Sequence, residues 1–261
     1  MSIISPKTTS LKKIYKYFQK LGLGLIAEES KRAGDLKKDL RFEKQTYKPD
    51  ILHLYRLHQF ILLNKRLNVL EYGTGWSTLV IFNALIINKK KYKNLDFLRI
   101  KKPFSLNVVD DNKKFINISK KRVKKIYKNN DVKFHYCKNK MSFYKKKYCS
   151  EYVNHPTINP DLIYLDGPDQ FKIQGRSNNF TISNYEMMPM NSDILKYEHF
   201  LNPGTIILTD GRTANARFLK ANFQRKWKYK FDEKNDQSLF YLNEKPLGRF
   251  NKKQMNFYKS R

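Results

Sequence analysis

The sequence predicts an α/β fold in which a mostly parallel sheet is covered by helices on both faces. From residue 49 onward, short apolar runs that end in acids or glycines alternate with longer amphipathic stretches, which is the pattern of β-α-β units. The chain has 261 residues, 40% of them apolar, and no internal repeat or long linker divides it. We therefore expect one main domain over residues 49–261, preceded by a helical extension over residues 1–48.

Five apolar runs are expected to form the parallel strands, and two alternating runs within residues 227–244 an antiparallel hairpin. Together they predict a doubly wound, Rossmann-like sheet of seven strands with a C-terminal antiparallel hairpin. The parallel strands are NVLEYG (68–73), FSLNVVDD (104–111), VKFHYC (132–137), DLIYLDG (161–167) and GTIILTDG (204–211).

Helices are expected between these strands. Pro49 suits the first turn of a helix, and Ser192 suits an N-cap. The expected helices cover residues 49–63, 77–88, 112–129, 192–204 and 212–226.

The first 45 residues are rich in lysine and predict helices with breaks near Gly22, Gly24 and Gly34. Apolar residues recur there at helical spacing with lysines between them. An amphipathic helix therefore fits better than a signal peptide, and we expect it to dock on the domain rather than lie on a membrane. The apolar positions are Leu11, Ile14, Phe18, Leu21 and Leu25.

The net charge is strongly positive. A formal charge of +30 favours a polyanionic partner such as nucleic acid. The basic residues are nevertheless 41 Lys and only 12 Arg, and Asn, Ile, Tyr and Phe are abundant, a mix that AT-rich codons produce. Proteins that recognise specific nucleic-acid sequences depend on bidentate hydrogen bonds from Arg and on aromatic stacking. Nucleic acid is therefore a second choice of partner, behind a small molecule.

Two cysteines, Cys137 and Cys149, form no CxxC pair, and no histidine pair has metal-ligand spacing. A disulfide framework and a structural zinc site are thus not indicated, and a reducing, cytoplasmic setting fits. No apolar run approaches the roughly 20 residues of a membrane span.

The stretch EYGTGWST, residues 71–78, joins the first expected strand to a helix. Gly73 and Gly75 allow a tight turn, and Ser77 opens a helix whose free N–H groups face a ligand. A dinucleotide-binding loop would have a third glycine where Thr78 stands, and Glu71 would repel a pyrophosphate. The loop better suits an ammonium or sulfonium cation, although a strand-to-helix turn can need two glycines for geometry alone.

In such a sheet, ligands lie beyond the carboxyl ends of the strands. Asp110 ends the second strand, where a carboxylate can accept hydrogen bonds from both hydroxyls of a ribose. Asp111 or Asn112 is expected to cap the following helix instead.

Four motifs in this order, VLEYGTGWST, VVDDN, DLIYLDGP and LNPGTIILTDGR, resemble class I S-adenosylmethionine-dependent methyltransferases. The resemblance covers residues 49–243. Within that superfamily, the LDGP and LTDGR strand ends are similar to the caffeoyl-CoA and catechol O-methyltransferase-like branch.

The resemblance implies an S-adenosylmethionine site. Glu71, Gly73 and Gly75 would cradle the methionyl part, and Asp110 the ribose. Two features depart from the family: 35 residues separate Gly75 from Asp110, and no acid follows the third strand, so the adenine contact falls to Asn139 or the backbone. The expected cofactor-binding residues are Glu71, Gly73, Thr74, Gly75, Ser77, Asp110, Asn139 and Asp166.

In the metal-dependent members of this branch, an acid after the fourth strand and an Asp-Asn pair after the fifth bind a divalent ion. Asp166 and Asp210 match two of these three residues, but Gly211 stands in place of the Asn. The sequence therefore leaves two alternatives for Asp166 and Asp210 as catalytic residues. They bind Mg²⁺, or Asp166 acts as a general base or binds the ammonium of the cofactor.

Two arginines, Arg176 and Arg212, flank the mouth of this site and are expected to bind an acidic or phosphorylated substrate. The alternative is an ion pair with Asp166 or Asp169. The five histidines are expected to be structural or surface groups: His53, His58, His135, His155 and His199.

The sequence thus predicts a cytoplasmic methyltransferase that uses S-adenosylmethionine to methylate a hydroxyl of a small molecule. An RNA or protein methyltransferase is the first alternative, because of the lysine-rich surface, and a non-enzymatic basic nucleic-acid-binding protein is the second. A homodimer is also among the expected assemblies.

Overall fold

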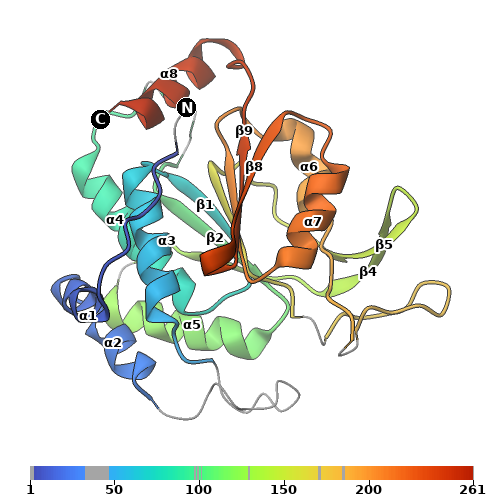
Figure 1. Cartoon of the computed structure of the whole chain (residues 1–261), viewed down its shortest axis with the longest axis horizontal. Coiled ribbons are helices and arrows are strands. Elements are labelled where there is room, and N and C mark those ends of the chain that lie inside the picture. Colours follow the sequence, from blue (N-terminus) through green and yellow to red (C-terminus); the bar gives the residue numbers. More distant parts are fainter. Residues whose placement is uncertain are drawn as a thin grey trace.

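The computed structural model describes residues 3–32, 47–96, 98, 100, 102–128, 130–169, 172–183 and 186–260. Its centre is a seven-stranded sheet with the order β3-β2-β1-β6-β7-β9-β8 (Figure 1). The first five of these strands run parallel, and β9 is antiparallel to both β7 and β8. The predicted doubly wound sheet with a C-terminal hairpin is confirmed. Its strands are β1 (Asn68–Tyr72), β2 (Ser105–Asp110), β3 (Lys133–Tyr136), β6 (Leu162–Leu165), β7 (Ile206–Asp210), β8 (Trp227–Asp232) and β9 (Gln237–Leu242).

Helices cover both faces of the sheet because neighbouring strand residues point to opposite sides. Val69 packs into one apolar cluster with the first five helices, whereas Leu70 packs into a second cluster with α6 and α7 (Figure 1). The helices are α1 (Leu11–Lys20), α2 (Gly24–Ser30), α3 (Ile51–Leu63), α4 (Trp76–Lys91), α5 (Lys113–Ile126), α6 (Asp193–Tyr197), α7 (Thr213–Asn222) and α8 (Gly248–Lys259).

The N-terminal helices dock on the domain, as expected. Phe18 of α1 is buried in the first cluster, and the Tyr17 hydroxyl lies 2.5 Å from Nδ1 of His58 on α3. The chain breaks between α1 and α2 at Gly22, where φ is +73°, while Gly24 begins α2 instead of breaking a helix. The break expected near Gly34 lies outside the described residues.

The helix expected over residues 192–204 is shorter than predicted. It ends at Tyr197, and a single 3₁₀ turn over Glu198–Phe200 follows. Ser192 does not cap it with its side chain, because the Ser192 hydroxyl donates to the carbonyl of Ser150 instead, at 3.2 Å.

Two features were not predicted. One is a hairpin of β4 (Asn139–Tyr144) and β5 (Lys147–Tyr152), which forms a separate two-stranded sheet that projects from the body (Figure 1). The other is α8, which packs at the amino ends of the parallel strands: the Tyr258 hydroxyl donates to Oδ2 of Asp161, just before β6, at 2.7 Å.

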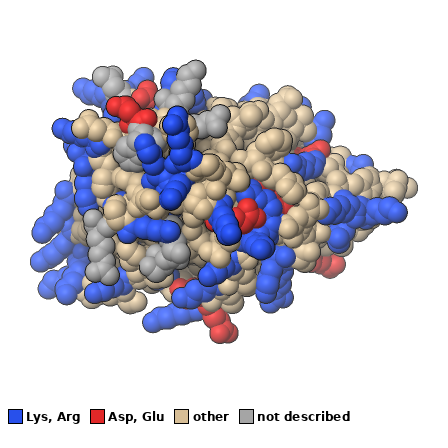
Figure 2. All heavy atoms as spheres, turned by 90° about the horizontal axis from the view of Figure 1, so that it is seen from above, with Lys and Arg blue, Asp and Glu red and all other residues tan. Residues whose placement is uncertain are grey.

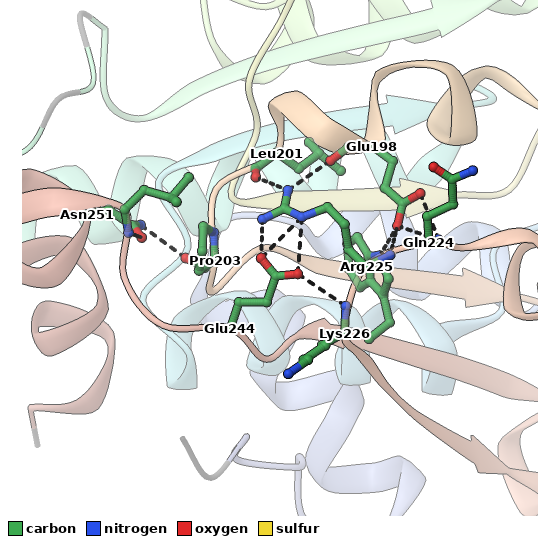
Figure 3. A network of polar contacts seen from close by, with 10 residues as sticks. Glu198, Leu201, Pro203, Gln224, Arg225, Lys226, Glu244 and Asn251 are labelled. Carbon is green, nitrogen blue, oxygen red and sulfur yellow. Dashed lines mark hydrogen bonds and ion pairs between the residues drawn. The ribbon is translucent and has the colours of Figure 1, made fainter.

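A polar network fixes the sheet at the amino ends of the parallel strands, where β7 begins and β9 ends (Figure 3). The Arg225 guanidinium binds the Glu244 carboxylate at 2.5 Å and also donates to the carbonyl of Leu201. Glu198 accepts hydrogen bonds from the Trp227 indole and from two backbone N–H groups. These contacts leave the opposite edge, at the carboxyl ends of the parallel strands, available for a ligand. No helix among the described residues is long and apolar enough to cross a membrane.

Candidate functional site

The β1–α4 turn is shaped by one indispensable glycine. Gly73 has φ of +85°, and a Cβ there would lie 2.9 Å from the backbone of Asp166. Gly75 is different, because a Cβ would find its nearest neighbour at 3.8 Å, from Ser77 Oγ. Thr78 takes the place of a third glycine: its hydroxyl accepts from the Gly75 N–H at 3.3 Å. The turn therefore packs directly against the loop after β6, and the N-terminus of α4 opens beside it.

Glu71 is fully buried beneath this turn. Its Oε1 accepts a hydrogen bond from the Ser77 hydroxyl at 2.5 Å, and its Oε2 has no hydrogen-bond partner among the described residues. Burial raises the pKa of Glu71 to about 8, opposed by the hydrogen bond from Ser77. An acid held in this way gains from a nearby cation, which restores its ionised form.

Asp110 lies at the end of β2 and faces the same turn. Its Oδ2 accepts from the Thr74 N–H at 2.7 Å, and its Oδ1 accepts from the Asn112 N–H at 2.6 Å. Asn112 is the cap of α5, accepting from Lys114 and Phe115, so the expectation of a cap at this position is confirmed. Burial raises the pKa of the adjacent Asp111 to about 7, and repulsion from Asp110 adds to the effect.

Asp166 follows β6 and lies between the other acids. Its side chain is 48% exposed, its Oδ1 lies 3.8 Å from Arg212 Nε, and its backbone carbonyl accepts from Arg212 Nη2 at 2.5 Å. The ion pair foreseen as the alternative role of Arg212 is thus present. Partial enclosure raises the pKa of Asp166 to about 7 against the lowering effect of Arg212, with Asp210 and Asp110 adding repulsion.

Asp210, at the end of β7, meets a histidine that the sequence assigned to a structural or surface role. His53 of α3 places Nδ1 3.3 Å from Asp210 Oδ1, and the Tyr164 hydroxyl donates to Asp210 Oδ2 at 3.0 Å. The close contact with the Asp210 carboxylate raises the pKa of His53, while burial opposes the shift. No sequence signal near His53 marks this pairing, because only the tertiary approach of α3 to β7 creates it.

Two connected cavities occupy this edge of the sheet. The first, about 340 Å³, is here called the ribose lobe and holds Asp110, Asp111 and Arg212. The second, about 320 Å³, is here called the aromatic lobe and holds His53, Trp76 and Arg122. Residues common to both mark their junction: Tyr47, Thr74, Phe115, Asp166 and Asp210.

Two predicted site residues lie away from both lobes. Asn139 begins β4, so the chain turns into the hairpin instead of staying beside the cavity. Its buried side chain has no hydrogen-bond partner among the described residues. Arg176 is exposed in the loop after β6 and lines neither lobe. The geometry therefore brings neither residue together with Asp110 and Asp166.

The side chains at this site do not suit the divalent ion that the resemblance to metal-dependent methyltransferases allowed. Asp210 engages both His53 and Tyr164, Asp166 faces Arg212, and Gly211 supplies no side-chain oxygen. Mg²⁺ needs several oxygen ligands in near-octahedral geometry. No cluster of three or more His, Cys, Asp or Glu side chains suited to a metal occurs in the described part of the chain.

Comparison with known proteins gives a likeness of fold. No family model matches the chain, and no curated protein does. Among solved structures, the crystal structure of SAH-bound Podospora anserina methyltransferase PaMTH1 is similar, with a TM-score of 0.48 and 12% identity. The match covers 92% of this chain and 100% of that one.

Proposed function

We propose that this protein is a methyltransferase that uses S-adenosylmethionine to methylate a hydroxyl of a small molecule. The observation that carries the proposal is the set of acids around the Gly73 turn: Glu71 behind it, Asp110 beside it and Asp166 in contact with it. Acids at these three strand ends disfavour a phosphate-bearing nucleotide and favour a nucleoside that carries positive charge.

The ribose of the cofactor would lie in the ribose lobe, and its methionyl part would reach the start of α4 at the junction with the aromatic lobe. Asp110 would accept its ribose hydroxyls, and the N–H groups at the start of α4 would face its carboxylate. The unpartnered Oε2 of Glu71 supports a cation nearby, and Ser77, which lines the aromatic lobe, stands between Glu71 and the cavity. The sulfonium and ammonium groups would then approach the junction, where Asp166 lies.

The acceptor would lie in the aromatic lobe, with its hydroxyl at the junction. Nδ1 of His53, held by Asp210, leaves Nε2 to take the hydroxyl proton. The acceptor oxygen would bond to the methyl carbon as the S–CH₃ bond breaks, which leaves a neutral thioether on the cofactor. His53 and Asp210 thus replace the divalent ion in our proposal, and the protein otherwise aligns and desolvates the reactants.

Two further features agree with the proposal. The LDGP and LTDGR strand ends support a small hydroxylated acceptor of the catechol type. A reducing, cytoplasmic setting agrees with the free, buried thiols of Cys137 and Cys149.

Calorimetric titration with SAM and with SAH tests the proposal. We expect both to bind with micromolar affinity, and Asp110→Asn to weaken binding by about 1–3 kcal/mol because a charged acceptor is lost. Lys121→Gln, an exposed change on α5, serves as the control. Absence of heat from either compound at well above micromolar protein concentration would refute the proposal.

A further inference from the structure

We infer that Arg56 and Asp232 are positioning residues for the proposed reaction, because their ion pair ties α3 to the sheet and so holds His53 against Asp210. The inference rests on the proposed function, since it explains how the base of that site is kept in place. No sequence motif marks either residue of the ion pair.

His53 and Arg56 are neighbours on one face of α3. Residues three apart on a helix have Cβ atoms about 5–6 Å from each other. Nδ1 of His53 lies 3.3 Å from Asp210 Oδ1, and Nη2 of Arg56 donates to Asp232 Oδ2 at 2.8 Å. This face of α3 therefore meets the sheet at two points, one of them the proposed base.

The two acids that α3 meets lie in register at the same edge of the sheet. Asp210 ends β7 and Asp232 ends β8, and both pair with Gln237 of β9, from opposite sides. Because neighbouring strands are about 4.8 Å apart, the two acids stand on the order of 10 Å from each other across β9. This spacing exceeds that of the two Cβ atoms on α3, and the long Arg56 side chain spans the difference.

The ion pair is well defined at both ends. The side chains of Arg56 and Asp232 are 11% and 34% exposed. Asn235 Nδ2 donates to both carboxylate oxygens of Asp232, at 2.9 and 2.8 Å. Burial would raise the pKa of Asp232, but the hydrogen bonds from Asn235 and the charge of Arg56 hold it below its usual value, so the carboxylate is ionised at neutral pH. An enclosed pair between ionised groups fixes a distance better than an exposed one does.

The rest of α3 is held mainly by apolar contacts. Leu57, Phe60 and Ile61 are buried in the first apolar cluster, whereas His53 lies in the first turn and its side chain is 32% exposed. Apolar packing is non-directional, while a hydrogen-bonded ion pair depends on angle and distance. The ion pair one turn after His53 therefore sets the rotation of the turn that carries the imidazole.

The pKa of His53 can report this tether, because charge and position act on it in opposite directions. The close contact with Asp210 raises the pKa, burial opposes the shift, and the positive charge of Arg56 lowers the pKa. Loss of the Arg56 charge alone would thus raise the pKa, whereas loss of the contact with Asp210 would lower it. The other acids that act on His53, or that His53 acts on, are Asp50 and Asp166.

An NMR titration of the His53 imidazole in the ligand-free protein, assigned with His53→Gln, tests the inference. We expect Arg56→Met to lower the pKa of His53 even though it removes a positive charge. Arg56→Lys keeps a charge that can pair with Asp232 and should stay closer to the wild type. Lys230→Met removes the same charge from an exposed position on β8 and should not lower the pKa.

A second matched pair changes the other end of the tether. Asp232→Asn should lower the pKa of His53 by more than Glu233→Gln, which removes the same charge from the next, exposed residue. Both variants leave Arg56 in place, so this comparison decides the question if Arg56→Met does not fold.

Two results would overturn the inference. A raised or unchanged pKa of His53 in folded Arg56→Met would show that Arg56 acts through its charge alone. Equal shifts in Asp232→Asn and Glu233→Gln would show the same for Asp232.

SAH calorimetry on the same proteins keeps this test apart from that of the proposed function. Neither Arg56 nor Asp232 lines either lobe, so their variants should bind SAH as tightly as the wild type. Failure of the wild type to bind SAH would refute the proposed function itself, whereas the His53 titration judges the ion pair independently of any ligand.

Discussion

At the scale of single residues, Glu71 is the most unusual group of the site, because it is a fully buried carboxyl with one oxygen unpaired among the described residues. Its pKa rises from 4.5 to about 8 on burial. The folded protein thus holds a proton that the unfolded chain releases. Stability of the ligand-free protein should therefore fall as pH rises through this interval.

Glu71→Gln should remove that part of the pH dependence. At pH 8 the ligand-free variant should be more stable than the wild type by at least ~1 kcal/mol, or about 2–4 °C in Tm, and the two should converge near pH 5. Thermal unfolding at several pH values measures the difference. A wild type that is more stable than the variant at pH 8 would show that an ionised Glu71 is satisfied without a ligand.

His53 and Asp210 form the second residue-scale unit. The close contact with the Asp210 carboxylate raises the pKa of His53 above its ordinary value of 6.5. The contact therefore stabilises the fold below that value, and the gain is lost as pH rises through the raised pKa. His53 can accept a proton only above that pKa, so the proposed methyl transfer should decline at acidic pH.

Asp210→Asn should lower the pKa of His53, because the charged partner is lost while the shape is kept. An NMR titration of the His53 imidazole, assigned with His53→Gln, measures the shift without any acceptor. The same variant should reduce methyl transfer by about 10–100-fold. An unchanged pKa of the His53 imidazole would show that His53 does not interact with Asp210 in solution.

Sequence reasoning found the acids at strand ends but not the histidine. Glu71, Asp110, Asp166 and Asp210 could be placed because apolar runs mark where each strand stops. His53 belongs to a helix before the first strand, and the distance along the chain to Asp210 hides their contact. Similarly, the sequence does not mark the hairpin that begins at Asn139, and this residue lines neither lobe.

At the scale of elements, the sequence predicts those helices and strands that contain an apolar run or a clear hydrophobic periodicity. Except for the edge strand β3, the parallel strands are buried on both faces and read as nearly continuous apolar segments. The β4–β5 hairpin is different, since its strands, NKMSFY and KYCSEY, mix polar and apolar residues without a regular alternation. It also turns at Lys145 and Lys146, which adopt positive φ without Gly or Asn. Helix α8 was missed because its buried face mixes polar with apolar residues. Asn251 donates to the Pro203 carbonyl (Figure 3), while Met255 and Tyr258 are also buried.

The β1–α4 turn gives a matched pair of substitutions. Gly73→Ala would bring a Cβ to 2.9 Å from the backbone of Asp166 at a φ of +85°, whereas Gly75→Ala meets nothing closer than 3.8 Å. We expect Gly73→Ala to lose about 1–3 kcal/mol of stability together with SAH binding. Gly75→Ala should keep the fold.

Denaturant unfolding and SAH titration of both variants check this difference. Retained SAH affinity in Gly75→Ala would mean that its glycine serves the turn rather than the ligand. Equal stability of the two variants would contradict the close packing of the Gly73 turn on the loop after β6.

At the scale of the whole molecule, the charge of +30 is the dominant property. Figure 2 shows Lys and Arg side chains in several separate regions of the face seen there, with other residues between them. Such a distribution favours weak, non-specific attraction to polyanions over a single shaped groove.

Filter-binding or anisotropy measurements with RNA and DNA of equal length test this reading. We expect similar affinities for both, a steep loss between 50 and 200 mM salt as described for phosphate contacts, and no effect of SAH. A marked preference for one folded RNA, strengthened by SAH, would support the alternative of an RNA methyltransferase.

A crystal structure of the protein with SAH would locate the cofactor and so decide the proposed function. We expect the ribose hydroxyls on the Asp110 carboxylate and the sulfur at the junction of the two lobes beside Asp166. SAH bound elsewhere, for example in the cavity of about 500 Å³ at the amino ends of the parallel strands next to Tyr258, or bound with its ribose away from Asp110, would contradict this expectation.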